Sequence, residues 1–468
     1  MAKFRELFAP RDLTEGTPWK RIVMFAIPML IGNIAQQLYN TADSIIVGKY
    51  VGDNALAAVG SASPILHLLL VLFVGVAVGA GIMVSQYFGA KDREKLSRTI
   101  GICITLTAIV SVIIMIVGPL VTRPMLSLLN TPDSIIDWCA GYLTIFFLGI
   151  AGFAFYNILA GILRGLGDSL SALMFLIIST ILNVGLDLLF VAKFNMGVPG
   201  VALATVIAQG ISAMLCAWKL VGMKTDFDLN WRMLKLDREY ASQLIKLGLP
   251  SGLTQAIFSL SMIVVQSLTN SFGEMFIACN VIVMRVDGFA MMPNFSFGTA
   301  MTTYTGQNIG AKRVDRVEKG TKDGIMMAVG VATTLTILIL LFGKTLIGFF
   351  TDTTALIDYS MNMMRILAVG YIAMAITQCL SGVMRGAGDT TTPMWISLIN
   401  TVGLRVPLAY GLAYLTRSDA YPNGRPESLF VSLLLTWVIG AMITTFFYKK
   451  GAWRKKGLVK QAAPAVAD

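Results

Sequence analysis

Residues 161–169 read GILRGLGDS, and residues 382–390 read GVMRGAGDT. The two stretches share the pattern Gly-x-x-Arg-Gly-x-Gly-Asp, and Arg385 follows Arg164 by 221 residues. A pattern that recurs at a long, fixed spacing indicates a duplicated structural unit. The sequence therefore predicts two homologous halves.

Two further matches keep this spacing. The stretch QYFGAK at residues 86–91 returns as QNIGAK at residues 307–312, and Pro28 has a counterpart in Pro250 at nearly the same offset. The matches follow the same order in both halves, which supports a duplication of the whole chain rather than of one motif.

Apolar segments of about 20 residues, the length that crosses a bilayer, recur throughout the chain. Its residues are 56% hydrophobic, and its mean hydropathy is +0.72. We count twelve such segments, six in each half, near residues 22–47, 55–83, 99–121, 135–158, 170–191, 199–221, 243–270, 276–303, 324–348, 358–380, 393–415 and 428–448. Because six is even, both halves start on the same side of the membrane. The predicted fold is an all-α integral membrane protein, with twelve transmembrane helices in two parallel six-helix repeats around a central cavity, an organisation typical of transporters.

The formal net charge of +11 invites comparison with nucleic-acid binders. Most of the 37 Lys and Arg residues, however, gather at alternate ends of the apolar segments, as the positive-inside rule predicts for cytoplasmic loops. We therefore expect a lipid bilayer and no nucleic acid as the partner of the charged surface. Both termini are expected in the cytoplasm.

The domain layout follows from the polar stretches between spans. We expect an N-lobe six-helix bundle at residues 1–222, a cytoplasmic linker at 223–240, a C-lobe bundle at 241–450 and a cytoplasmic tail at 451–468. The polar start of the chain lacks the early apolar core of a cleaved signal peptide, so the first span is expected to remain in the mature protein.

No motif for catalysis, transition-metal or cofactor binding is recognisable. His67 is the single histidine and is expected to be a buried, hydrogen-bonded residue rather than a proton relay. The five cysteines are scattered singly and read as small buried hydrophobes: Cys103, Cys139, Cys216, Cys279 and Cys379. We expect neither an enzyme nor a resident cofactor.

Acidic residues inside apolar spans are candidates for function because their insertion is costly, about 2.5 to 3.5 kcal/mol each. The first half has two, Asp43 and Asp187, each six residues before a lysine at the outer side, Lys49 and Lys193. At 1.5 Å per residue, both lie about 9 Å below the outer boundary. The sequence therefore places two carboxylates at one depth.

Polar neighbours accompany these acids. Asn183 shares a helix face with Asp187, Tyr39 shares one with Asp43, and Thr205 and Tyr142 lie at similar depth on other spans. The plainer alternative is that each group makes an ordinary hydrogen bond between helices. Two carboxylates at one depth favour a cation-coupling site instead. Its hard oxygen ligands suit Na+ at Asp43, Asn183, Asp187 and Thr205, and its paired acids suit a proton, so the sequence leaves H+ and Na+ open.

The second half does not repeat this chemistry. Arg405 stands where the first half has Asp187, while Arg285 and Asp287 lie inside the eighth span. These charges either form a structural ion pair between helices, in which Asp287 and Arg405 are partners, or they line a cargo cavity. Met291 and Met292, on the same span, would add an adaptable surface to such a cavity, and ordinary packing against lipid or the core is the alternative for both.

These motifs together resemble the multidrug and toxic compound extrusion (MATE) family over almost the whole chain. The Gln-x-x-Gly-Ala and Arg-Gly-x-Gly-Asp turns carry the resemblance. The aspartate of the first helix and the Asn-x-x-x-Asp of the fifth are similar to the DinF-like prokaryotic branch. The resemblance implies cation-coupling roles for Asp43, Asn183 and Asp187, with Thr205, Tyr39 and Tyr142, and a bending role for Pro28.

The resemblance implies an antiporter, driven by H+ or Na+, that exports organic, drug-like compounds across the prokaryotic cytoplasmic (inner) membrane by alternating access of two bundles. The expected substrate is cationic or amphipathic, and the protein is expected to be a monomer. Arg285 and Arg405 outnumber the one nearby acid, Asp287, which does not fit a purely cationic cargo. A lipid-linked saccharide flippase is the alternative, because inner-span arginines suit a pyrophosphate group.

Overall fold

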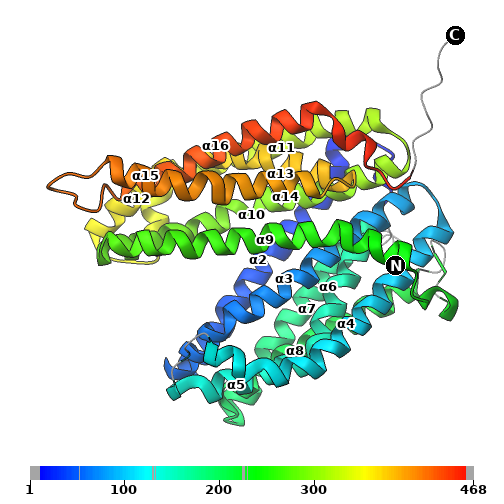
Figure 1. Cartoon of the computed structure of the whole chain (residues 1–468), viewed down its shortest axis with the longest axis horizontal. Helices are drawn as coiled ribbons and strands as arrows, with labels where there is room; N and C mark the ends of the chain where they lie inside the picture. The colour runs from blue at the N-terminus through cyan, green and yellow to red at the C-terminus, as the bar shows by residue number, and fades with distance from the viewer. Residues whose placement is uncertain are drawn as a thin grey trace. The chain divides into compact units, whose positions relative to one another are not determined.

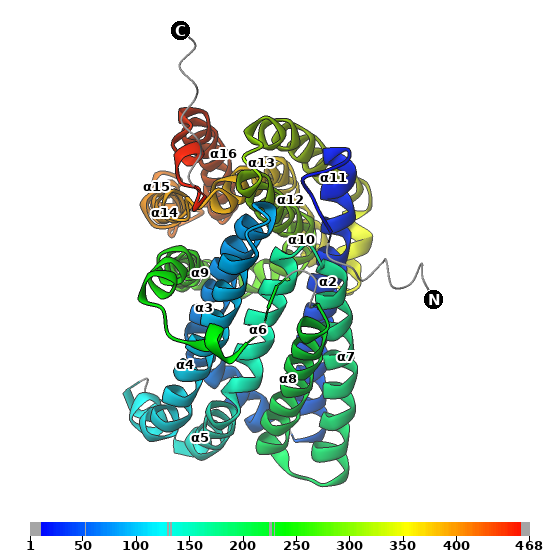
Figure 2. The ribbon, with the colours of Figure 1, turned by 90° about the vertical axis from the view of Figure 1, so that its right-hand side faces the viewer.

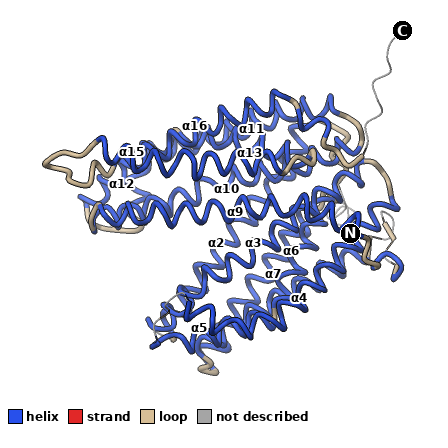
Figure 3. The backbone as a smooth tube through the Cα atoms, viewed as in Figure 1, coloured by secondary structure: helices blue, strands red, loops and turns tan. Residues whose placement is uncertain are grey.

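A computed structural model describes residues 11–51, 53–128, 131, 133–223, 227–228 and 230–459. Within these ranges the chain is helical, and its extended pairing amounts to one isolated bridge between Ser418 and Tyr421 (Figure 3). The described elements of the first repeat are α2 (Pro18–Tyr50), α3 (Asp53–Gly89), α4 (Arg93–Leu128), α5 (Asp133–Leu148), α6 (Ile150–Gly165), α7 (Ser169–Asp187), η1 (Leu188–Lys193) and α8 (Gly197–Val221).

The second repeat follows a short connection that contains η2 (Trp231–Leu234). Its elements are α9 (Arg238–Ser271), α10 (Glu274–Gly310), α11 (Val314–Gly348), α12 (Thr354–Ala368), α13 (Gly370–Gly386), α14 (Thr391–Leu398), η3 (Ile399–Leu404), α15 (Arg405–Leu415) and α16 (Glu427–Lys450), followed by the short η4 (Ala452–Lys455). In Figure 1 the colour passes along the first repeat from blue to green and along the second from green to red.

Every predicted apolar segment lies within one of these helices or within two or three consecutive ones. Among the described residues, nine helices are long and apolar enough to cross a membrane, and two bent pairs add two spans. The remaining predicted segment lies in α3, of which Phe73–Gly89 is a shorter apolar helix. The structure thus agrees with the predicted all-helical membrane fold.

Both bends fall at glycines that the two repeats share. The chain bends by 52° between α5 and α6, at Gly149, and by 42° between α12 and α13, where Gly370 begins the second helix. A Cβ atom on Gly149 would lie 2.1 Å from Val206 Cγ1, and one on Gly370 would lie 2.5 Å from Trp437 Cε3. Only glycine allows these close approaches, so a side chain there would push the two packed elements apart.

The duplicated turns have the same geometry in both halves. After α6 the amide of Gly167 donates to Arg164 O at 2.9 Å, and after α13 the amide of Gly388 donates to Arg385 O at 2.9 Å. Both glycines have positive φ, +87° and +95°. This left-handed residue ends a helix without the steric cost that other residues incur. The structure therefore supports the duplication inferred from the sequence.

The chain forms two compact units, and two helices are divided between them. The first unit contains Ile31–Gly252, and the second contains Leu13–Leu30 together with Leu253 onward. The start of α2 thus belongs to the second unit and its remainder to the first. In α9 the residues up to Gly252 belong to the first unit, and those from Leu253 onward belong to the second. The N-lobe and C-lobe boundaries expected at residues 222 and 241 stay a prediction.

Hydrogen bonds hold Leu13, which precedes α2, in the second unit. The amide of Leu13 donates to Gln307 Oε1 at 2.8 Å, and Leu13 O accepts from Asn308 Nδ2 at 3.3 Å and from Arg316 Nη2 at 3.2 Å. Gln307 and Asn308 begin the second copy of the Gln-x-x-Gly-Ala motif. The motif therefore satisfies the backbone of the segment that precedes α2.

Candidate functional site

A buried polar cluster lies on α7 and α8 of the first unit. Asn183 and Asp187 are fully buried, and Thr205 is 8% exposed. The Asn183 amide is oriented by its neighbours, so that Nδ2 donates to Asp187 Oδ2 at 3.0 Å and Oδ1 accepts from the Thr205 amide at 3.3 Å. The hydroxyl groups of Tyr39 and Thr205 lie 3.3 Å apart. Four of the six predicted coupling residues therefore belong to one network.

Local helix geometry explains how this cluster forms. Asn183 and Asp187 are four residues apart on α7, so their side chains lie on one face. The helices α7 and α8 run side by side in Figure 2 and pack directly against each other. The π-helical segment η1 begins directly after Asp187. Such segments are rare and are frequent at functional sites, because they interrupt the regular helical hydrogen bonding.

The other predicted residues of this cluster are placed less closely. Tyr142 is buried on α5, with its ring centroid 6.4 Å from that of Phe146. Asp43 lies in α2, but its side chain is outside the described part of the structure, as is that of His67. Pro28 lies inside α2, two residues before the division between the units. The coupling roles of Asp43 and Tyr142 and the bending role of Pro28 stay predictions.

The residues present are oxygen donors suited to a hard cation or a proton. Asp187 supplies a carboxylate, Asn183 an amide oxygen and Thr205 a hydroxyl. No group of three or more His, Cys, Asp or Glu side chains gathers in the described ranges. The described donors of this cluster are oxygen atoms, the ligand type that hard cations prefer.

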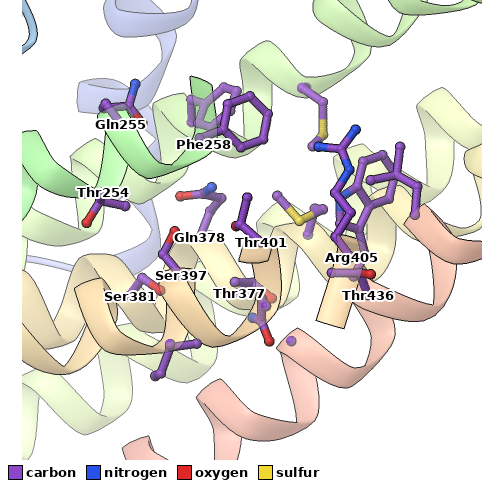
Figure 4. A pocket seen from close by; sticks show the side chains of 18 of the residues that line it. Thr254, Gln255, Phe258, Thr377, Gln378, Ser381, Ser397, Thr401, Arg405 and Thr436 are labelled. Carbon is purple, nitrogen blue, oxygen red and sulfur yellow. The ribbon is translucent and has the colours of Figure 1, made fainter. Parts of the chain in front are cut away.

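The second unit contains a cavity of about 370 Å³ between α9, α10, α13, α14, η3, α15 and α16. It lies among apolar and uncharged polar side chains, and its charged lining residues in the described chain are Asp287, Arg385 and Arg405. Figure 4 shows Arg405 and Thr436 at one end, and Thr254, Gln255 and Ser381 toward the other. The volume falls within the range of small-molecule pockets.

The predicted C-lobe residues divide between this cavity and other surroundings. Asp287, Met291 and Arg405 line it. Arg285 is exposed and lies outside the lining, because i and i+2 residues point to different faces of α10. Met292 is buried and also lies outside the lining. The expected contact between Asp287 and Arg405 is not a direct ion pair in the described structure, although the two charges interact electrostatically.

Two polar lining residues, Thr377 and Ser381, were not predicted from the sequence, and Arg385 was named there only as part of the repeated turn. Thr377, Ser381 and Arg385 follow one another at intervals of four on α13 and form a polar stripe on an apolar helix. This spacing of four residues is the sequence feature from which a polar face of α13 could have been predicted. The aromatic Phe258 and Trp437 also line the cavity, but nothing in their spacing distinguishes them from lipid-facing or core residues.

All five cysteines are free and buried, as expected for small apolar residues. Cys139 Sγ donates to Ala58 O at 3.3 Å, which shows how one of these thiols satisfies its polar atom inside the bundle. This placement is consistent with the prediction that the cysteines are small buried hydrophobic residues.

Comparisons with known proteins agree with the repeat and the fold. The MatE family model matches residues 28–189 and again residues 250–411. The probable multidrug resistance protein YoeA of Bacillus subtilis is 30% identical over 469 residues, which cover 98% of this chain and 99% of that protein. The probable multidrug resistance protein YpnP of the same organism is 28% identical over 445 residues, which cover 95% and 97%.

Solved structures are similar over nearly the whole chain. A multidrug resistance MATE family transporter in an outward-facing conformation has a TM-score of 0.86 at 25% identity, covering 95% of this chain and 98% of that one. A MOP superfamily transporter from Pyrococcus furiosus, described as having a binding pocket of reverse polarity, has a TM-score of 0.84 at 26% identity, covering 94% and 97%.

These matches confirm the predicted twelve-helix fold and do not favour the flippase alternative. They also agree with the expectation that the protein is not an enzyme, because the family consists of transporters. Since the family model matches each repeat in turn, and a relative of 30% identity matches almost end to end, the chain belongs to the MATE family of multi-pass membrane transporters.

Proposed function

We propose that this transporter exports small organic, drug-like compounds across the cytoplasmic membrane in exchange for H+ or Na+. The observation that carries the proposal is the buried network of Asn183, Asp187, Thr205 and Tyr39 in the first unit. A carboxylate inside a membrane span is costly to keep, and a coupling ion or proton gives it a function. The names of the relatives as multidrug resistance proteins support the class of cargo.

In this mechanism Asp187 is the group that binds the ion. Asn183 orients the carboxylate through its Nδ2 donor, and the Thr205 hydroxyl faces both Asn183 and Tyr39. Asp43 is the second acid of the site. Binding of the ion favours one arrangement of the transporter over the other, because ions shift an equilibrium only by binding the two states unequally.

The membrane arrangement belongs to the same proposal. We expect the protein to function as a monomer. Both termini lie in the cytoplasm in this proposal, since the basic residues gather on that side of the spans. The change between inward and outward access involves bending of α2. Pro28 weakens this helix close to the division between the units.

Transport into proteoliposomes under an imposed gradient tests this function. With a fluorescent drug as cargo, wild type should transport in response to a pH gradient or a Na+ gradient. Asp187→Asn and Asp43→Asn should each reduce gradient-driven transport at least about 100-fold while inserting normally, because neutralising a membrane acid relieves an insertion cost. Asp137→Asn, in an exposed pair with Arg123, is the matched control and should transport normally.

Two outcomes would contradict the proposal. Wild-type rates in a well-inserted Asp187→Asn protein would remove the N-lobe site. Transport by wild type that ignores both gradients would remove coupling altogether. Comparing the pH and Na+ gradients separately also decides which ion is used.

A further inference from the structure

The guanidinium group of Arg405 is the most unusual charge in the second unit. Arg405 is 7% exposed and lines the cavity, at the start of α15 directly after the π-helical η3. Within the described chain its side chain has no ion pair and no hydrogen-bond acceptor. A guanidinium carries five N–H donors, and a buried charge is costly unless it is paired and hydrogen-bonded. The cavity into which Arg405 faces is therefore the place where its acceptor is to be sought.

The other charges of the cavity leave a positive excess. Arg385 also lines it and likewise has no side-chain acceptor among the described residues. Among the described residues, Asp287 is the single acid that lines the cavity. It interacts with the Tyr371 hydroxyl and with the charge of Arg405. Two cationic groups thus stand against one carboxylate, which favours an anionic ligand over a cationic one.

The remaining lining suits an aromatic body attached to that anion. Phe258, Met291 and Trp437 present apolar surface, and Thr436 adds a hydroxyl at the end where Arg405 lies (Figure 4). Small-molecule sites are mostly apolar with a few polar groups that fix orientation, and this cavity fits that description. The planar fork of arginine matches the two oxygens of a carboxylate or the oxygens of a phosphate or sulfonate.

We propose that this cavity binds an amphipathic organic anion, with an anionic oxygen group held by Arg405 and an aromatic or aliphatic body among the apolar side chains. The inference rests on the proposed export function in that it names the class of cargo. It is a statement about binding, however, and it can be tested without an ion gradient. The proposed ligand is an anion, whereas the substrate expected from the sequence is cationic or amphipathic.

The test measures binding of three naphthalene compounds by calorimetry of the purified full chain, with empty micelles as the blank. The compounds are naphthaleneacetate as the anion, naphthaleneethanol as the neutral analogue and naphthylethyl-trimethylammonium as the cation. Wild type should bind the anion about tenfold more tightly than the alcohol, and the cation most weakly. Arg405→Gln should remove the preference for the anion and leave binding of the alcohol unchanged.

Two further variants keep the result interpretable. Arg405→Lys retains the charge but loses the planar fork, so it should keep part of the anion preference. Arg365→Gln removes a charge from an exposed position on α12, where Arg365 donates to Asn362, and should bind all three compounds as wild type does. If Arg405→Gln fails to fold, the Arg405→Lys variant carries the comparison.

Tighter binding of the cation than of the anion would overturn the proposal, as would an anion affinity that Arg405→Gln leaves unchanged. An equal loss in Arg365→Gln would overturn it too, because the effect would then come from net charge alone. Anion binding without gradient-driven transport would overturn the proposed function and leave this inference standing. Transport of cations alone, with no anion binding, would overturn this inference and leave the proposed function standing.

Discussion

Asp187 and Arg405 stand at corresponding positions of the two repeats, and each adjoins a π-helical segment. Asp187 directly precedes η1, and Arg405 directly follows η3. The motif Gly-Leu-Asp of the first repeat is matched by Gly-Leu-Arg in the second. Each unit thus has a π-helical segment beside one of these residues, after Asp187 in the first unit and before Arg405 in the second, and the two residues carry opposite charge. This difference in charge agrees with the two proposals above, in which the ion binds in the first unit and an anion in the second.

Conversion of Asp287 to Asn tests these two assignments. If coupling uses the first unit alone, Asp287→Asn should retain ion-driven transport, measured in proteoliposomes under an imposed gradient. Its anion affinity should rise several-fold, because a like charge is removed from the surroundings of the ligand. Loss of ion dependence in a well-folded Asp287→Asn protein would move the coupling site to the second unit.

Pro28→Ala should weaken the response of α2 to pH. Proline removes a backbone hydrogen bond and weakens the helix, so its replacement should stiffen α2 between the start of the helix and Asp43. The measurement is the distance between spin labels on α2 and on α6 at low and high pH. Wild type should show a pH-dependent change that the variant lacks.

Pro250→Ala is the matched control for this experiment. Pro250 occupies the equivalent place in α9, but the position corresponding to Asp43 falls near Val265, so its replacement should affect the pH response less. An unchanged response in Pro28→Ala would mean that Pro28 is a static kink.

Gly75→Ala should destabilise the first unit by about 1 to 3 kcal/mol through overpacking. A Cβ atom on Gly75 would lie 2.6 Å from Gly252 Cα, because α3 and the start of α9 pack with their backbones in close approach. Small residues permit such packing between membrane helices. Gly330→Ala provides the contrast, since nothing lies within 4 Å of that added atom and the helix gains up to about 1 kcal/mol. Melting temperatures of the two purified variants should move in opposite directions, and equal shifts would contradict the packing account.

The ion pair between Arg93 and Asp228 predicts a pH dependence of stability outside the membrane. Arg93 donates to both carboxylate oxygens of Asp228, at 2.8 and 2.9 Å, and this hydrogen bonding holds the pKa of Asp228 below its usual range. A carboxyl whose folded pKa is lowered stabilises above its unfolded pKa of about 4, and the contribution is lost as pH falls through the folded value.

Asp228→Asn should therefore lower the melting temperature slightly at pH 7, and its difference from wild type should shrink below about pH 4. Both residues are about half exposed, so the effect should be small and should weaken further in high salt. Asp419→Asn, at an exposed position in the loop between α15 and α16, is the control. A difference that grows as pH falls would contradict the sign of this prediction.

The sequence by itself determined the duplication, the positions of the spans and the turns between them. These features depend on local composition and spacing: apolar length sets a span, and the glycines at 167 and 388 permit the left-handed residue that ends a helix. The pairing of Asn183 with Asp187 was predictable for the same reason, because four residues make one turn of helix.

Only the tertiary structure decided where the cavity of the second unit lies and which charged side chains line it. Whether Arg405 and Arg385 point to lipid, to a neighbouring helix or to a cavity depends on how each helix is rotated against segments distant in the chain. The helix breaks at Gly149 and Gly370 depend likewise on contacts with Val206 and Trp437. Such packing is set by shape complementarity between whole helices, which no short stretch of sequence encodes.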